Sequence, residues 1–111
     1  TTIDKSELER LNTIFKYLID QIKITKLDFR SKMIGDDMIK ILTLCTNLKN
    51  INHLILSSNN ISDKGMEYFS KCDFLKNITH FVLSFNSISD KGMEYFSKCH
   101  FLKNITHLVL Y

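Results

Sequence analysis

Residues 61–83 read ISDKGMEYFSKCDFLKNITHFVL, and residues 88–110 read ISDKGMEYFSKCHFLKNITHLVL. The two stretches are offset by 27 residues and differ only at Asp73/His100 and Phe81/Leu108. The same period continues more loosely toward the N-terminus, where apolar residues align in columns: Ile24, Ile51, Ile78 and Ile105 are one of them. A fixed period of this length indicates stacked structural repeats, because one unit cannot bury its apolar face alone.

Within each unit a short strand is predicted first and a helix second. Leu54 and Leu56 are spaced by two, as in a strand with one buried face. Asn59 follows, and its side chain is suited to hydrogen-bond neighbouring backbone where the chain turns away. Ser62 then supplies a helix N-cap, and apolar residues recur at helical spacing: Met66, Phe69 and Cys72. We therefore expect strand, turn, helix and return in every unit.

The pattern L-x-x-L-x-L-x-x-N over residues 51–59 and 78–86, followed by I-S-D-K-G, resembles that of leucine-rich repeat proteins. The helix-bearing unit is most similar to the ribonuclease-inhibitor-like subclass. The resemblance covers residues 24–111, about three full repeats plus a terminal strand. It implies an α/β solenoid with a curved parallel sheet inside and helices outside. Lys32 replaces the Asn in the first register, so we expect a less regular turn there.

Residues 1–23 are predicted to form an N-terminal capping helix. Ser6 and Glu9 fit a capping box, in which each side chain satisfies a free backbone N–H group of the other. An apolar stripe at helical spacing follows: Leu8, Leu11, Ile14, Phe15, Leu18, Ile19 and Ile22. The opposite side carries both signs of charge, which favours a cap over the alternative of a helix lying on a membrane surface.

The C-terminal end lacks a comparable cap in the sequence. If residues 107–110 form a strand, the core under Leu108 and Leu110 is open and the strand edge is unpaired. Two explanations remain open. The chain is a fragment of a longer array, or a second copy covers this edge in a homodimer.

Composition narrows the class of protein. The chain has 111 residues, which suit one domain, and no apolar run long enough to span a membrane. Its net charge of +3 is spread over a mixture of lysines and carboxylates, which does not favour nucleic-acid binding. Three cysteines cannot all pair within the chain, and we expect buried thiols in a reducing, cytoplasmic compartment, including that of a host cell.

Motifs that would indicate an enzyme or a cofactor are missing from the sequence. It contains no P-loop, dinucleotide-binding glycine motif, H-E-x-x-H pair or nucleophile elbow, so we expect neither catalysis nor a bound cofactor. The glycines lie near predicted helix starts, where close packing of helix against strand explains them better than phosphate binding: Gly35, Gly65 and Gly92.

Side chains between the buried strand positions are predicted to face outward from the concave sheet, in columns set by the period. The first column holds Lys26, His53, His80 and His107; the second holds Asp28, Ile55, Val82 and Val109; the third holds Arg30, Ser57, Ser84 and Tyr111. A zinc site is disfavoured because the outer histidines lie about 10 Å apart, whereas zinc ligands converge on one point. Three histidines in a row instead predict some pH sensitivity.

The second column predicts an exposed apolar strip, which is typical of an interaction site, and Phe85 would enlarge it. We therefore expect a module that binds a protein partner through the concave face. By resemblance, its relatives include inhibitors, adaptors, receptors and bacterial effectors, and the near-identical repeats fit a recently expanded effector or receptor array. The alternative is a structural repeat segment that assembles through its C-terminal edge.

Overall fold

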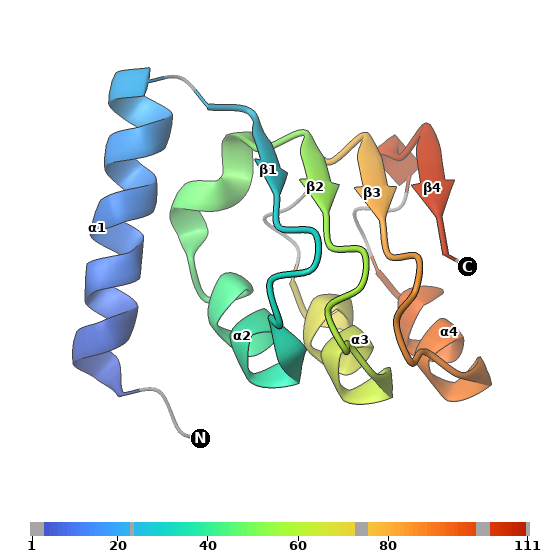
Figure 1. Cartoon of the computed structure of the whole chain (residues 1–111). Coiled ribbons are helices and arrows are strands. Elements are labelled where there is room, and N and C mark those ends of the chain that lie inside the picture. Colours follow the sequence, from blue (N-terminus) through green and yellow to red (C-terminus); the bar gives the residue numbers. More distant parts are fainter. Residues whose placement is uncertain (1–3, 23, 73–75, 100–102, 111) are drawn as a thin grey trace.

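The computed structural model describes residues 4–22, 24–72, 76–99 and 103–110. Helix α1 comes first, and three strand–helix units and a last strand follow (Figure 1). The elements are α1 (Lys5–Ile22), β1 (Lys26–Asp28), α2 (Gly35–Leu42), the 3-10 helix η1 (Thr46–Asn50), β2 (His53–Ile55), α3 (Asp63–Ser70), β3 (His80–Val82), α4 (Asp90–Phe96) and β4 (His107–Val109).

The four strands form one parallel sheet in the order β1-β2-β3-β4. Leu27 pairs with Leu54, Leu54 with Phe81, and Phe81 with Leu108, so each step of the register is one sequence period. Helices α2, α3 and α4 stack in the same order beside the strands (Figure 1). The α/β repeat solenoid expected from the sequence is confirmed.

The core lies between the sheet and the helices and repeats from unit to unit. Leu54 and Phe81 enter it from the strands, and Met66 and Phe69 enter it from α3. The three cysteine side chains are buried, as expected for small apolar groups: Cys45, Cys72 and Cys99. Burial raises the pKa of the Cys45 and Cys99 thiols to about 11, so both are protonated at neutral pH.

Asparagine side chains join each turn to the unit before it. The Asn59 amide nitrogen donates to the carbonyl oxygen of Phe29, and its Oδ1 accepts from the backbone N–H groups of Lys32 and Ile34. Asn86 repeats the arrangement one period later. Asn59 of the second unit thus holds the first turn, so the first turn does not need an asparagine at position 32.

The expectation of a less regular first turn is therefore wrong. Ser31 has a φ of 52°, close to the 57° of Ser58, and Met33 has a φ of 55°, close to the 58° of Asn60. The backbone repeats because the hydrogen bonds that shape it come from the following unit, where the asparagine is present.

A second set of polar contacts joins the N-termini of the helices. Asp36 accepts hydrogen bonds from the backbone N–H and the hydroxyl of Ser62, and Asp63 accepts the same pair from Ser89. A Cβ atom at Gly65 would lie 2.6 Å from Asp36 Oδ1. The glycine therefore makes room for the aspartate of the preceding helix. Our explanation by helix–strand packing was wrong, because the closest contact joins two helices.

Helix α1 begins earlier than the capping box predicts. Its first residue is Lys5, and Asp4 Oδ1 accepts the backbone N–H of Glu7 at 2.8 Å. Ser6 lies inside the helix, so the proposed box is wrong, because the carboxylate of Asp4 supplies the acceptor. Phe15 of the predicted stripe is buried, whereas Ile14 is 54% exposed. Helix α1 packs against η1.

Strand β4 differs from the strands before it in the burial of its inward residue. Leu108 is 40% exposed, whereas its equivalents Leu54 and Phe81 are 3% and 0% exposed. The reason is that each inner strand position is covered by the next unit, and β4 is the last strand that the structure describes.

Candidate functional site

The sheet face turned away from the core carries the first two predicted columns. Lys26, His53, His80 and His107 pair in succession across the four strands, and so do Asp28, Ile55, Val82 and Val109. On β1, β2 and β3 the residue between them, such as Leu54, is buried, so the alternation places both columns on the opposite side. We call these eight residues the open sheet face.

The three histidines of the open sheet face are stacked ring on ring. The ring centroids of His53 and His80 are 4.0 Å apart with an interplanar angle of 11°, and those of His80 and His107 are 4.1 Å apart at 8°. The rings are parallel rather than convergent, because the strand spacing repeats one rotamer at each step. This arrangement does not direct three ring nitrogens at one point, as a zinc ion would require.

Each histidine is held by the residue before it. His53 Nδ1 lies 2.5 Å from Asn52 Oδ1. His80 Nδ1 lies 2.9 Å from Thr79 Oγ1, and His107 Nδ1 lies 3.0 Å from Thr106 Oγ1. The Thr79 hydroxyl donates to the carbonyl oxygen of Asn52, and the Thr106 hydroxyl donates to that of Thr79. Because a hydroxyl has one hydrogen, each threonine oxygen accepts from Nδ1–H, which leaves Nε2 to take up a proton.

The stack disfavours a proton on its central ring. The pKa of His80 is lowered from its ordinary value, first because partial burial penalises the charged ring and then because His53 and His107 repel a proton on it. At neutral pH the His80 side chain is therefore uncharged.

The second column forms a partly exposed apolar strip across three strands. Ile55, Val82 and Val109 lie side by side and all are half-buried. On β1 the strip gives way to a polar pair, because Asp28 occupies the equivalent position.

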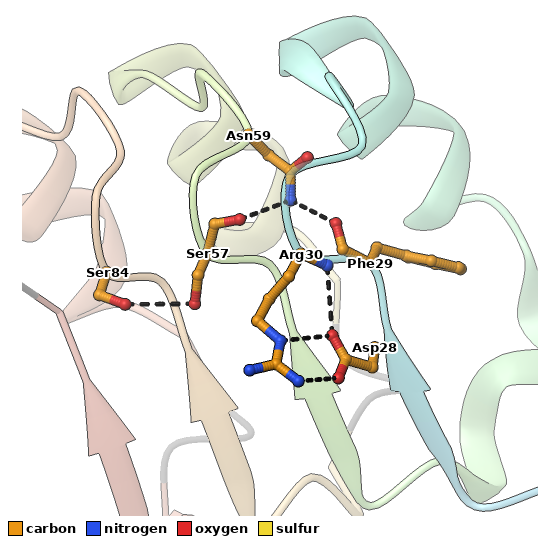
Figure 2. Close-up of polar contacts among 6 residues, drawn as sticks. All are labelled: Asp28, Phe29, Arg30, Ser57, Asn59 and Ser84. Atoms are coloured by element: carbon orange, nitrogen blue, oxygen red, sulfur yellow. Dashed lines mark hydrogen bonds and ion pairs between the residues drawn. The ribbon is translucent and has the colours of Figure 1, made fainter.

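Asp28 and Arg30 form a bidentate ion pair at this end of the face (Figure 2). The guanidinium Nε lies 3.1 Å from Asp28 Oδ1, and NH2 lies 2.7 Å from Oδ2. The hydrogen bonds from Arg30 lower the pKa of Asp28, and Asp28 raises the pKa of Arg30. The pair is consequently neutral as a unit. The positive charge at the β1 end of the open sheet face is therefore that of Lys26.

The third predicted column is only partly an outward-facing one. Ser57 and Ser84 are each 8% exposed, and the Ser84 hydroxyl donates to that of Ser57 at 3.2 Å (Figure 2). Both serines nevertheless line the surface hollow beyond the strand ends, so they lie on the predicted side of the sheet but are recessed, because their hydroxyls bind each other. Arg30 of the same column is exposed, and Tyr111 lies outside the described residues.

Beyond the strand ends lies a hollow of about 420 Å³. Ile55 and Val82 form part of its lining, so it is continuous with the apolar strip. Phe85 also lines it, is 79% exposed and has a φ of 59°. A non-glycine residue in this left-handed region costs about 1 kcal/mol, which the Asn86 hydrogen bonds offset.

Ser31 and Ser58 also line this hollow, and the sequence reasoning did not include them. Both occupy the position of Phe85 in the preceding units and share its left-handed backbone, with φ values of 52° and 57°. The period itself was the signal that could have found them, because it aligns them with Phe85.

Over the described residues, His, Cys, Asp and Glu side chains do not gather in threes as a metal ion would require. Within the same part of the chain, the helices are too short or too polar to cross a membrane.

A family model described as leucine-rich repeat matches residues 47–70 and 74–97. These two stretches are leucine-rich repeats. Each matched stretch contains one strand and the helix that follows it, and β1 and β4 continue the parallel sheet on either side of the matched strands. The curated proteins contain no match to the chain. Leucine-rich repeats generally mediate protein–protein interaction and typically act as binding scaffolds without catalysis.

Proposed function

We propose that this leucine-rich-repeat domain binds a protein partner through its open sheet face. The observation that carries the proposal is the apolar strip of Ile55, Val82 and Val109, which crosses three strands and stays partly exposed. Contiguous exposed apolar surface is typical of interaction sites. The polar groups beside it, the histidine stack and the Asp28–Arg30 pair, surround the strip as a rim does in protein interfaces.

Phe85 supports the same proposal from the strand ends. Its ring is largely exposed beside the 420 Å³ hollow, and its backbone adopts a conformation that aromatic residues rarely adopt. An exposed aromatic side chain at the margin of a hollow is suited to anchor a partner. We assign Phe85 to the binding surface for this reason.

The proposal is tested by a paired substitution on the open sheet face. His80→Glu with Val82→Asp adds two negative charges to half-buried positions of that face and should lower partner affinity at least about tenfold, because it buries charge in the interface. Lys91→Glu on α4 is the matched control, because it changes the net charge equally at an exposed helix position. Proteins captured from lysate by each variant, after a check of folding by circular dichroism, would be compared.

A protein retained by the parent chain and by Lys91→Glu, but lost by the paired variant, is the expected result. Equal retention by all three proteins would contradict binding through this face. A photo-reactive residue at position 82 then tests direct contact, because it should cross-link to the captured partner.

The compartment and the wider class follow as proposals from the same structure. The buried thiols support a reducing compartment such as a cytoplasm, including that of a host cell. The α-helix in each described unit supports the ribonuclease-inhibitor-like subclass. An effector, a receptor or an adaptor would use the open sheet face in the same manner.

A second candidate function is self-assembly through β4. The observation that favours it is the 40% exposure of Leu108, which is a core residue in the preceding units. Pairing of β4 with β4 of a second copy would bury this leucine and extend the sheet. Leu108→Lys should then convert a dimer into a monomer in analytical ultracentrifugation, whereas Lys91→Glu should not. A parent chain that sediments as a monomer at all concentrations tested would exclude this candidate.

A further inference from the structure

The open sheet face offers a partner positive charge but no unpaired negative charge among its described residues. Lys26 and the three histidines form one continuous column over β1, β2, β3 and β4. Asp28 is the carboxylate of the described columns, and Arg30 binds it at both oxygens. The column therefore presents the Lys26 ammonium and three stacked imidazole rings, with no unpaired carboxylate among the described column residues.

The spacing of the column matches a helix better than a strand. Neighbouring parallel strands lie about 4.8 Å apart, so the column and the apolar strip both repeat at that pitch. On a helix surface, residues three and four apart lie about 5–6 Å from each other, whereas same-side residues of a strand lie about 6.6 Å apart. A helix laid across the strands can place one row of side chains over the column and the adjacent row over the strip.

We propose that the open sheet face binds an acidic amphipathic helix, with its carboxylates over Lys26, His53, His80 and His107 and its apolar side chains on the strip. The inference rests on the proposed function and names its partner class. Charge complementarity selects carboxylates for the column, and Ile55, Val82 and Val109 select apolar residues for the second row.

Binding of such a helix should be coupled to proton uptake. In the free protein, the His80 ring is stacked about 4 Å from the rings of His53 and His107, and its Nδ1 lies beside the Thr79 hydroxyl. A carboxylate facing the ring favours the charged form and raises the lowered pKa of His80. Affinity should therefore rise as pH falls below the ordinary histidine pKa, and should fall again once the helix carboxylates are protonated near pH 4.

The test uses two synthetic helical peptides of about 18 residues that differ only in four Glu or four Gln at i, i+4 spacing, next to a leucine row. Fluorescence anisotropy would compare their affinities at about pH 7.5 and pH 5.5, on either side of the histidine range. The Glu peptide should bind about tenfold more tightly at the lower pH, the change that one proton gained over one pKa unit gives. The Gln peptide should bind weakly at both.

Three variants separate the contributions. His80→Gln keeps a polar side chain beside Thr79 but removes the central proton site, so it should flatten the pH dependence. Lys26→Gln should weaken binding at both pH values and leave their ratio unchanged, because lysine stays charged throughout. Lys91→Gln on α4 removes one positive charge at a site away from the sheet, and it should change neither the affinity nor its dependence on pH. In the NMR spectrum, the His80 ring should titrate at higher pH with the Glu peptide present.

Equal affinity for the Glu and Gln peptides, no binding of either, or an unchanged pH ratio in His80→Gln would overturn the inference. Binding of an 18-nucleotide single strand with the same variant profile would also overturn it, because the face would then read polyanions in general. These results do not bear on the capture experiment, which tests the proposed function separately. The proposed function is contradicted only if the paired variant His80→Glu with Val82→Asp retains the partner.

Discussion

Replacing Asn59 with alanine is expected to lower the free energy of unfolding by about 3 kcal/mol, since it leaves several buried backbone groups without partners. The Asn59 side chain is 1% exposed. Its nitrogen donates to the Phe29 oxygen at 2.7 Å and to the Ser57 oxygen at 3.2 Å (Figure 2). Its Oδ1 accepts from Lys32 N at 2.8 Å and from Ile34 N at 3.2 Å. Urea unfolding followed by circular dichroism measures the change.

Asn50→Ala is the matched control for this substitution. Asn50 is exposed at the end of η1, so its replacement should change stability by no more than about 0.5 kcal/mol. A loss of less than about 1 kcal/mol for Asn59→Ala would contradict the role of this side chain in joining the first two turns.

Gly65→Ala is expected to destabilise the protein by about 2–3 kcal/mol, although alanine is the better helix former by about 1 kcal/mol. The new Cβ would lie 2.6 Å from Asp36 Oδ1 and 2.7 Å from Ile61 Cγ2. Asp36 is not free to move, because its oxygens bind the backbone N–H and the hydroxyl of Ser62. Thermal and urea unfolding of the variant measure the loss.

A double-mutant cycle with Asp36→Ala identifies the cause. If the collision with Asp36 dominates, the alanine at position 65 should cost at least about 1 kcal/mol less in the Asp36→Ala background than in the parent. A remaining loss is expected, because the contact with Ile61 persists. Stabilisation by Gly65→Ala in the parent chain would mean that helix propensity outweighs the contact, against this account.

The open sheet face was predictable in part, and its columns show where prediction stops. The period placed His53, His80 and His107 in one row, and the strand register has them there. The period did not indicate that Nδ1 of each ring is held by the preceding residue or that the rings stack in parallel. Those features depend on rotamers, and rotamers depend on the neighbouring strand.

Ser57 and Ser84 mark the same limit on the candidate site. Alternation along an ideal strand predicts both as outward-facing, but β2 ends at Ile55 and β3 at Val82. Once the chain leaves the strand, alternation no longer decides which way a side chain points. Both serines line the hollow beside the apolar strip, yet each is only 8% exposed, because their hydroxyls bind each other.

The sequence by itself determined that this protein is a stack of strand–helix units with a parallel sheet in a register of 27 residues. A period determines the register because identical units stack most favourably when equivalent residues lie side by side. Only the tertiary structure decided that Asn59 holds the turn before its own and that Gly65 accommodates Asp36. These contacts join residues of neighbouring units, and a one-dimensional pattern does not contain the distance between them.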